Sequence, residues 1–169
     1  MKVPIFGKIT NVFFLLRGTY QLVVKKSSWE SLKRKLKRLT KKTLGYNLSY
    51  RLTQLKLVWQ GWLNNYRIAN IHTKLKQLDE WLRNRLRYCT RLPDGQVWHD
   101  WKKPERKRKN FIRLGIAQGQ AYAWSRTRMG GWAVAQSPML KTTITISRLK
   151  RRGYQSMLDY YSTFQPSIR

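Results

Sequence analysis

The sequence predicts a mainly α-helical domain that begins with a β-hairpin. Residues 9–25 are rich in β-branched and aromatic side chains, a composition typical of strands. From Ser27 onward, apolar residues instead recur at steps of three and four, the spacing that places them on one face of a helix. The hydrophobic fraction is 41 %, with eight Trp, nine Tyr and five Phe, and so many large side chains indicate a packed core rather than a disordered basic chain.

The predicted hairpin consists of the runs ITNVFFLL and TYQLVVK, which a short turn at Arg17-Gly18 joins. A helix is expected directly after it. Ser27 and Glu30 have the spacing of a capping box, in which two side chains bond the backbone at the start of a helix. Gly45, in a Gly-Tyr-Asn turn, is expected to end this helix.

This first helix should have one apolar and one cationic face. The apolar face is formed by Trp29, Leu32, Leu36 and Leu39. The opposite face carries Lys33, Arg34, Lys35, Lys37, Arg38, Lys41 and Lys42. A helix with this pattern packs its apolar face on a core and presents its charge to solvent or to a partner.

Two further helices are expected to begin near Ser49 and after Thr73, which suits the N-cap position. The apolar face of the second is formed by Leu48, Leu52, Leu55, Trp59, Trp62, Tyr66 and Ala69. The apolar face of the third is formed by Leu75, Leu78, Leu82, Leu86 and Cys89. The adjacent acids Asp79 and Glu80 precede Arg83 at spacings that allow ion pairs on the surface of the third helix.

Shorter helices are expected after a Pro-Asp-Gly loop at residues 93–95. Ser137 and Pro138 form an N-cap followed by proline at the first helical position, a common way for a helix to start. That helix should end near Gly153, and a last short helix should cover residues 157–164.

Positive charge dominates the composition. Thirty-six Lys and Arg against seven Asp and Glu give a formal net charge of +29 at pH 7. Between Lys102 and Lys109, six of eight residues are basic. This excess extends over several helices with few acids to pair it, so it predicts a polyanionic partner whose phosphates relieve the self-repulsion. Charge alone does not choose between RNA and DNA.

The acidic residues give no indication of catalysis. Two-metal polymerases and nucleases need carboxylates that converge on divalent ions. The acids of this chain are Glu30, Asp79, Glu80, Asp94, Asp100, Glu105 and Asp159. They form no Asp-x-Asp pair and no Tyr-x-Asp-Asp turn, and the neighbours Asp79 and Glu80 point about 100° apart on a helix. We therefore expect no enzymatic activity, no bound metal and no cofactor.

The cysteine and histidine content and the hydropathy argue against a disulfide-bonded, zinc-binding or membrane protein. One cysteine, Cys89, excludes an internal disulfide, and His72 and His99 lack the repeated pairing of a zinc site. Cys89 is expected to be a small buried residue. The longest apolar run, residues 12–16, is far shorter than the roughly 20 residues that span a membrane. We expect a location in the bacterial cytoplasm or an organelle, without secretion and without a membrane partner.

The large aromatic residues divide into two groups. Trp59, Trp62 and Trp81 lie on or beside apolar helix faces and are expected in the core. A second group lies nearer the basic segments and consists of Trp98, Trp101 and Tyr122. Rings in that position are able to stack on unpaired bases, as in RNA recognition, and for this group stacking and packing both stay open.

Five segments occur in order along the chain: GWLNNYRIAN, LDEWLRNRLR, WHDWKKP, LGIAQGQAYAWSRTRMGGWAVAQSPML and LKRRGYQSML. Together they resemble the maturase-specific domain of group II intron-encoded proteins, the region that follows the reverse transcriptase. The resemblance extends over residues 27–169, and the hairpin with the first helix resembles the approach to the thumb. Residues 91–97, RLPDGQV, depart from the pattern as an insertion.

The resemblance implies a helical thumb-and-maturase module, residues 27–169, that binds group II intron RNA. Family members help the intron reach its splicing-competent fold, while the RNA performs the transesterifications. Residues 1–26 would then be a hairpin that remains from the link to a polymerase domain. No segment of the chain resembles the fingers and palm of a reverse transcriptase or a Cys- or His-rich endonuclease, so neither activity is implied. A separate reverse-transcriptase domain is expected as a further partner.

The expected RNA contacts are cations opposite apolar helix faces or within and after the basic segment. They are Lys33, Arg34, Lys37, Arg38, Lys41, Arg83, Arg87, Lys102, Lys103, Arg106, Lys107, Arg108, Arg126 and Arg128. Two other interpretations stay open: a non-functional or split fragment of such a maturase, and a general basic nucleic-acid-binding protein. Genomic context would identify a split element, and a comparison of structured RNA with duplex DNA would identify a general binder.

Overall fold

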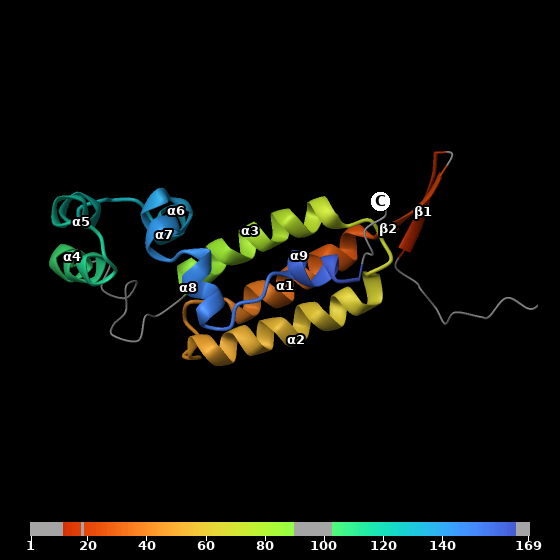
Figure 1. Cartoon of the computed structure of the whole chain (residues 1–169), viewed down its shortest axis with the longest axis horizontal. Coiled ribbons are helices and arrows are strands. Elements are labelled where there is room, and N and C mark those ends of the chain that lie inside the picture. The colour runs from red at the N-terminus through yellow and green to blue at the C-terminus, as the bar shows by residue number, and fades with distance from the viewer. Residues whose placement is uncertain (1–11, 18, 90–102, 165–169) are drawn as a thin grey trace, which may run out of the picture.

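The computed structural model describes residues 12–17, 19–89 and 103–164, and it is mainly helical within them (Figure 1). The strands are β1 (Val12–Arg17) and β2 (Thr19–Val24). The helices are α1 (Lys26–Leu39), α2 (Leu48–Tyr66), α3 (His72–Cys89), α4 (Pro104–Arg113), α5 (Gln118–Ser125), α6 (Gly131–Gln136), α7 (Pro138–Thr143), α8 (Ile146–Arg151) and α9 (Met157–Ser162). The predicted fold class is confirmed. The loop at residues 93–95 and the side chains of Trp98, His99, Trp101 and Lys102 lie outside the described residues.

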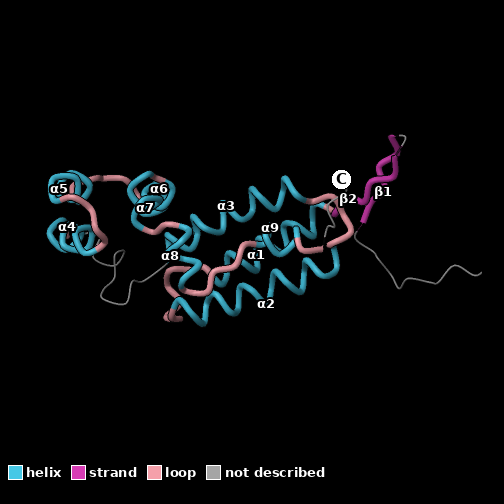
Figure 2. Tube along the Cα trace, in the orientation of Figure 1, coloured by secondary structure: helices cyan, strands magenta, loops and turns pink. Residues whose placement is uncertain are grey.

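The predicted hairpin is present. Strands β1 and β2 pair antiparallel, in a register that runs from Val12 opposite Val24 to Arg17 opposite Thr19. The chain then enters α1 at Lys26, so the hairpin and the helical part are almost continuous (Figure 2). That the hairpin remains from a link to a polymerase domain stays a prediction.

Helices α1, α2 and α3 surround the larger core. In Figure 1 all three run along the long axis of the molecule, and α9 packs on α3 and α2. The apolar faces predicted for the three helices meet here: the buried residues include Leu32, Leu36, Leu52, Leu55, Trp59, Leu63, Leu75, Leu78, Leu82, Leu86 and Cys89. Helices α8 and α9 return from the C-terminal part and close the core with Leu149, Met157 and Tyr161.

A smaller core lies among α4, α5, α6 and α7. Its fully or almost fully buried members are Phe111, Ala121, Val134, Ala135 and Leu140. Helix α6 also packs against α3, so the two cores are joined through this contact. The contact brings the start of α6 close to the cationic side of α1, and this position matters for the candidate interface.

The predicted capping box at the start of α1 is wrong. Helix α1 begins at Lys26 with Lys25 as the N-cap residue, and no side chain caps it. Ser27 therefore lies inside the helix rather than before it, because the chain turns into the helix almost immediately after β2. The start predicted for the second helix is close: α2 begins at Leu48 behind Asn47, whose side chain accepts a hydrogen bond from the Tyr50 N–H at 2.8 Å. Helix α3 begins at His72, so the prediction of Thr73 as its N-cap is wrong.

Helix α1 ends at Leu39, well before the Gly45 that the sequence predicts. The reason is Arg51 of α2, which is 2 % exposed. Its guanidinium donates to the carbonyl oxygens of Leu39 and Lys41 at 3.0 Å and of Leu44 at 3.1 Å. These bonds satisfy carbonyl groups at and beyond the helix end, and they hold the chain in a non-helical path there.

The C-terminal helices are shorter than predicted. Ser137 and Pro138 do start a helix, α7, but it ends at Thr143 and does not continue to Gly153. A separate helix, α8, begins after Thr145, whose hydroxyl accepts a hydrogen bond from the Arg148 N–H at 3.3 Å. Gly153 follows α8 with a φ of 95°, a left-handed conformation that glycine adopts without strain.

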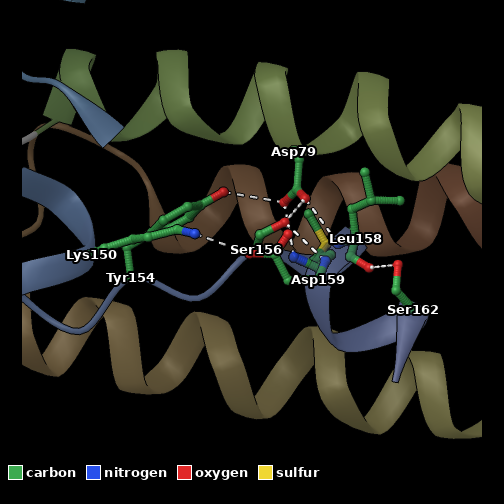
Figure 3. Close-up of polar contacts among 8 residues, drawn as sticks. Asp79, Lys150, Tyr154, Ser156, Leu158, Asp159 and Ser162 are labelled. Carbon is green, nitrogen blue, oxygen red and sulfur yellow. Dashed lines mark hydrogen bonds and ion pairs between the residues drawn. The ribbon is translucent and has the colours of Figure 1, made fainter. Parts of the chain in front are cut away.

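Asp79 of α3 is buried at 2 % exposure and holds the start of α9 (Figure 3). Its carboxylate accepts from the hydroxyl of Ser156 at 2.6 Å and from the hydroxyl of Tyr154 at 3.2 Å. It also accepts from the backbone N–H groups of Met157 and Leu158 at 3.1 and 2.9 Å. The prediction of a surface position for Asp79 is therefore wrong, because this side chain is the polar link between α3 and α9.

The tryptophans predicted to be in the core differ in burial. Trp59 is 2 % exposed, as predicted. Trp62 and Trp81 are only partly buried and pack against the edge of the larger core. Trp62 lies between Trp29 and Tyr66, with ring centroids 4.6 and 4.5 Å away. Across the described residues, no helix is long and apolar enough to cross a membrane.

Candidate nucleic-acid interface

The outer side of α1 is cationic and exposed. We name it the α1 cationic face and define it as Lys33, Arg34, Lys37 and Arg38 of the helix together with Lys41, two residues past the helix end; all five are exposed. Leu32 and Leu36 are buried on the opposite side of the helix, so the burial of the apolar stripe sets the direction of the charged one. These five residues are also the predicted RNA contacts of the first helix.

Arg85 of α3 supports this face from behind. Its guanidinium donates to the Thr40 hydroxyl at 3.1 Å and to the Thr40 carbonyl oxygen at 2.9 Å, just beyond the end of α1. Burial lowers the pKa of Arg85 from its usual value, but a guanidinium titrates so far above neutrality that it stays charged. A fixed positive charge at this point offsets the negative end of the α1 dipole.

A groove of about 650 Å³ lies beside the α1 cationic face. Four cations line it: Lys33, Arg34 and Lys37 from α1 and Arg85 from α3. The other lining residues are Trp81 of α3, Trp132 of α6 and Glu30 of α1. The groove therefore combines a cationic wall with two indole rings, and three helices contribute to it.

The groove's rings and cations are in direct contact. The Lys33 ammonium lies 5.1 Å from the centroid of the Trp81 ring, and the Arg85 guanidinium carbon lies 5.6 Å from that of Trp132. Tyr88 supports Trp132 in an edge-to-face contact at 5.8 Å. Trp132 remains 36 % exposed. Cation–π contacts within about 6 Å are attractive, so they help to hold these side chains in place.

A second cationic area covers α4 and the segment after α5. Lys103, Arg106, Arg126 and Arg128 are exposed there, and Arg108 is partly buried. Arg126 stacks on Tyr122, with its guanidinium carbon 4.4 Å from the ring centroid. Tyr122 is 45 % exposed, so one of the three rings proposed for base stacking is accessible.

Two of the predicted contact residues point into the protein. Arg87 is 5 % exposed and donates to the Ile144 carbonyl oxygen at 3.1 Å and to the Asn84 side-chain oxygen at 2.9 Å. Lys107 is 5 % exposed, and its ammonium donates to the Ser125 carbonyl oxygen at 3.2 Å. Burial lowers the pKa of both groups. We remove these two residues from the proposed contacts, because each one joins helices within the fold; Arg83 is partly buried and stays in the set.

The structure adds cations that the sequence-based set lacks. Arg113, Arg151 and Arg152 line a pocket of about 280 Å³ between the end of α4 and α8. Arg148 lies in the same pocket and donates to the carbonyl oxygens of Thr143 and Leu114. Arg113 stands far from the others in the sequence, whereas Arg148, Arg151 and Arg152 belong to a short basic run that the sequence-based set did not include.

The ionisable groups of the described residues form no arrangement typical of a catalytic centre. No group of three or more His, Cys, Asp and Glu within this part of the chain is placed to hold a metal ion. Asp79 is engaged with α9, and Asp159 pairs with Lys150 at 3.2 Å. Cys89 is buried, as predicted, and burial raises the pKa of its thiol, which disfavours the reactive thiolate.

Comparison with known protein families places a maturase model on this chain. The family described as "Group II intron, maturase-specific domain" matches residues 29–115, slightly more than half of the chain. The match contains all of α2, α3 and α4 and nearly all of α1, and with them the α1 cationic face. The resemblance predicted for the segments after Gly115 lies outside it. A search of curated proteins found no match. The chain therefore belongs to the family of group II intron maturase-specific domains, and its role is a maturase-related one in the splicing of group II introns.

Proposed function

We propose that the chain binds group II intron RNA through the α1 cationic face and helps that RNA to reach its splicing-competent fold. The observation that carries this proposal is the exposure of four cations on one side of α1 and of Lys41 just past its end, within the segment that matches the maturase family. Among the described residues, the structure records no ion pair for Lys33, Arg34 or Lys37. These charges are available to a polyanion.

A cationic helix face suits folded RNA in particular. A compact RNA brings many phosphates close together, and cations on a rigid surface relieve the resulting repulsion. Each phosphate that the protein neutralises also releases condensed counterions, which favours binding. A protein that binds the folded RNA more tightly than the unfolded RNA shifts the population toward the folded form by that difference in affinity.

The proposal assigns the chemistry of splicing to the RNA. Support comes from the acids, because Asp79 joins two helices and Asp159 pairs with a lysine. We propose that the chain itself has neither DNA-synthesis nor nuclease activity, since such activities need converging carboxylates.

The salt dependence of RNA affinity tests this proposal. The logarithm of the binding constant for a group II intron RNA should fall linearly with the logarithm of salt concentration, by about 0.7 to 0.9 per phosphate neutralised. Changing Lys37→Gln together with Arg38→Gln should make the slope shallower by about 1.4 to 1.8, because two phosphate contacts are lost. Filter binding or fluorescence anisotropy over a salt series measures this slope.

The matched control removes the same charge elsewhere. Lys56→Gln with Lys76→Gln changes two cations of α2 and α3 that do not line the groove beside α1. The control should leave the slope close to that of the parent. A slope near zero in the parent would contradict the proposal, and so would equal affinity for intron RNA and for duplex DNA of the same length.

A further inference from the structure

The groove beside the α1 cationic face has the size of a ligand site rather than of a flat surface. Its volume is about 650 Å³, within the range of about 300–1,000 Å³ that is typical of small-molecule sites. One nucleotide fits such a space. Two of its walls belong to different cores, because α1 and α3 pack in the larger core and Trp132 follows the start of α6 in the smaller one.

Trp132 is placed to offer a flat apolar surface. The ring is 36 % exposed, although Val134 and Ala135 of the same helix are fully buried. Those two residues anchor α6, and Tyr88 packs on the Trp132 ring in an edge-to-face contact. An exposed ring on an anchored helix costs little conformational entropy when a base stacks on it, and indole rings are common stacking surfaces for nucleic-acid bases.

Cations stand on the wall beside this ring. Lys33, Arg34 and Lys37 line the same groove, and their flexible side chains reach toward whatever occupies it. The Lys33 ammonium lies over the Trp81 ring, and because such contacts are weak at exposed sites, a phosphate can draw it away. Glu30 is the carboxylate among the lining residues, and it is able to accept hydrogen bonds from the amino group of a base.

We infer that this groove binds an unpaired nucleotide of single-stranded RNA, with the base stacked on Trp132 and the neighbouring phosphates on Lys33 and Lys37. The inference rests on the proposed function, because it names the part of the RNA that binds at the α1 cationic face. Duplex RNA does not suit the groove, since its bases are covered by their stacked neighbours and its narrow major groove excludes side chains. The partner is therefore a loop, bulge or end of the intron.

Trp132→Ala tests the inference on the whole chain. The affinity for a single-stranded RNA oligonucleotide should fall by about 5- to 150-fold, the range expected when one base–aromatic stack is removed. The affinity for duplex RNA of the same length should stay the same, and the salt slope should stay the same because no charge is lost. Trp132→Phe should retain most of the affinity. A fluorescent 2-aminopurine base in the oligonucleotide should be quenched by the parent and not by Trp132→Ala.

The control variant is Tyr50→Ala, which removes another ring that is 48 % exposed but lies on α2. It should leave both affinities unchanged. Unchanged single-strand affinity in Trp132→Ala, with the parent still binding RNA in a salt-dependent way, would overturn the inference and leave the proposed function standing. Equal losses for single-stranded and duplex RNA would overturn it as well. A parent that binds neither RNA would instead remove the proposed function itself.

Discussion

Replacing Asp79 with alanine should lower the free energy of unfolding by about 3–5 kcal/mol, because buried donors lose a charged acceptor. The carboxylate accepts four hydrogen bonds, two from hydroxyl groups and two from backbone N–H groups at the start of α9. Burial and the nearby Asp79 carboxylate raise the pKa of Tyr154, so this phenol remains a donor at neutral pH.

Urea unfolding followed by circular dichroism measures the loss. Asp79→Asn keeps one acceptor oxygen and the shape of the side chain, so its loss should be smaller than that of Asp79→Ala. The matched control is Glu80→Ala, which removes the neighbouring acid from an exposed position. Surface changes of this kind usually stay within about 0.5 kcal/mol. If Asp79→Ala and Glu80→Ala had the same small effect, the buried link between α3 and α9 would be wrong.

Trp59→Ala should cost about 3–5 kcal/mol, the range for large aromatic residues in protein cores. Trp59 is 2 % exposed and packs edge-to-face on Tyr160 of α9 at 5.3 Å, so its removal leaves a cavity between α2 and α9. Leu57→Ala on the same helix is the control, because Leu57 is 60 % exposed. The midpoint of urea unfolding should move strongly for Trp59→Ala and little for Leu57→Ala. Equal shifts of the urea midpoint in the two variants would mean that Trp59 is not on the side of α2 that packs in the core.

Local periodicity predicted the helices of the larger core well. Leu32 and Leu36 on α1 and Leu75, Leu78, Leu82 and Leu86 on α3 repeat at steps of three and four, and all of them are buried. Because the apolar side of α1 is buried, the cations on its other side must face solvent, so the α1 cationic face was predictable. The helix ends were less predictable, because α1 ends where Arg51 binds the carbonyl oxygens of Leu39 and, beyond the helix, of Lys41.

Contacts between residues that lie far apart in the chain could not be predicted from the sequence. Asp79 has an acidic neighbour and a basic residue four positions later, which is the pattern of a surface helix, yet its partners lie 75 to 79 residues away. Arg87 and Lys107 also looked like surface cations in basic segments. A signal existed for Lys107, which precedes the buried Phe111 by four positions and so shares its helix face.

The α1 cations of the candidate groove could be predicted from the sequence, but its tryptophan Trp132 could not. Its cations Lys33, Arg34 and Lys37 come from one helix and were among the expected contacts, whereas Trp132 follows them by almost a hundred residues. Trp132 reaches the groove because α6 packs on α3, and no local pattern encodes that contact. The rings that the sequence suggested for stacking, Trp98, Trp101 and Tyr122, belong to other segments.

Splicing at different magnesium concentrations tests the central claim most directly. The cognate group II intron RNA would be allowed to splice at low and at high magnesium, without protein, with the parent chain, and with the Lys37→Gln, Arg38→Gln variant. Magnesium and a cationic protein surface both neutralise crowded phosphates, so each can partly replace the other. The account predicts that the parent accelerates splicing most at low magnesium and little at high magnesium, and that the variant does so less. No acceleration at any magnesium concentration, with RNA binding intact, would contradict it.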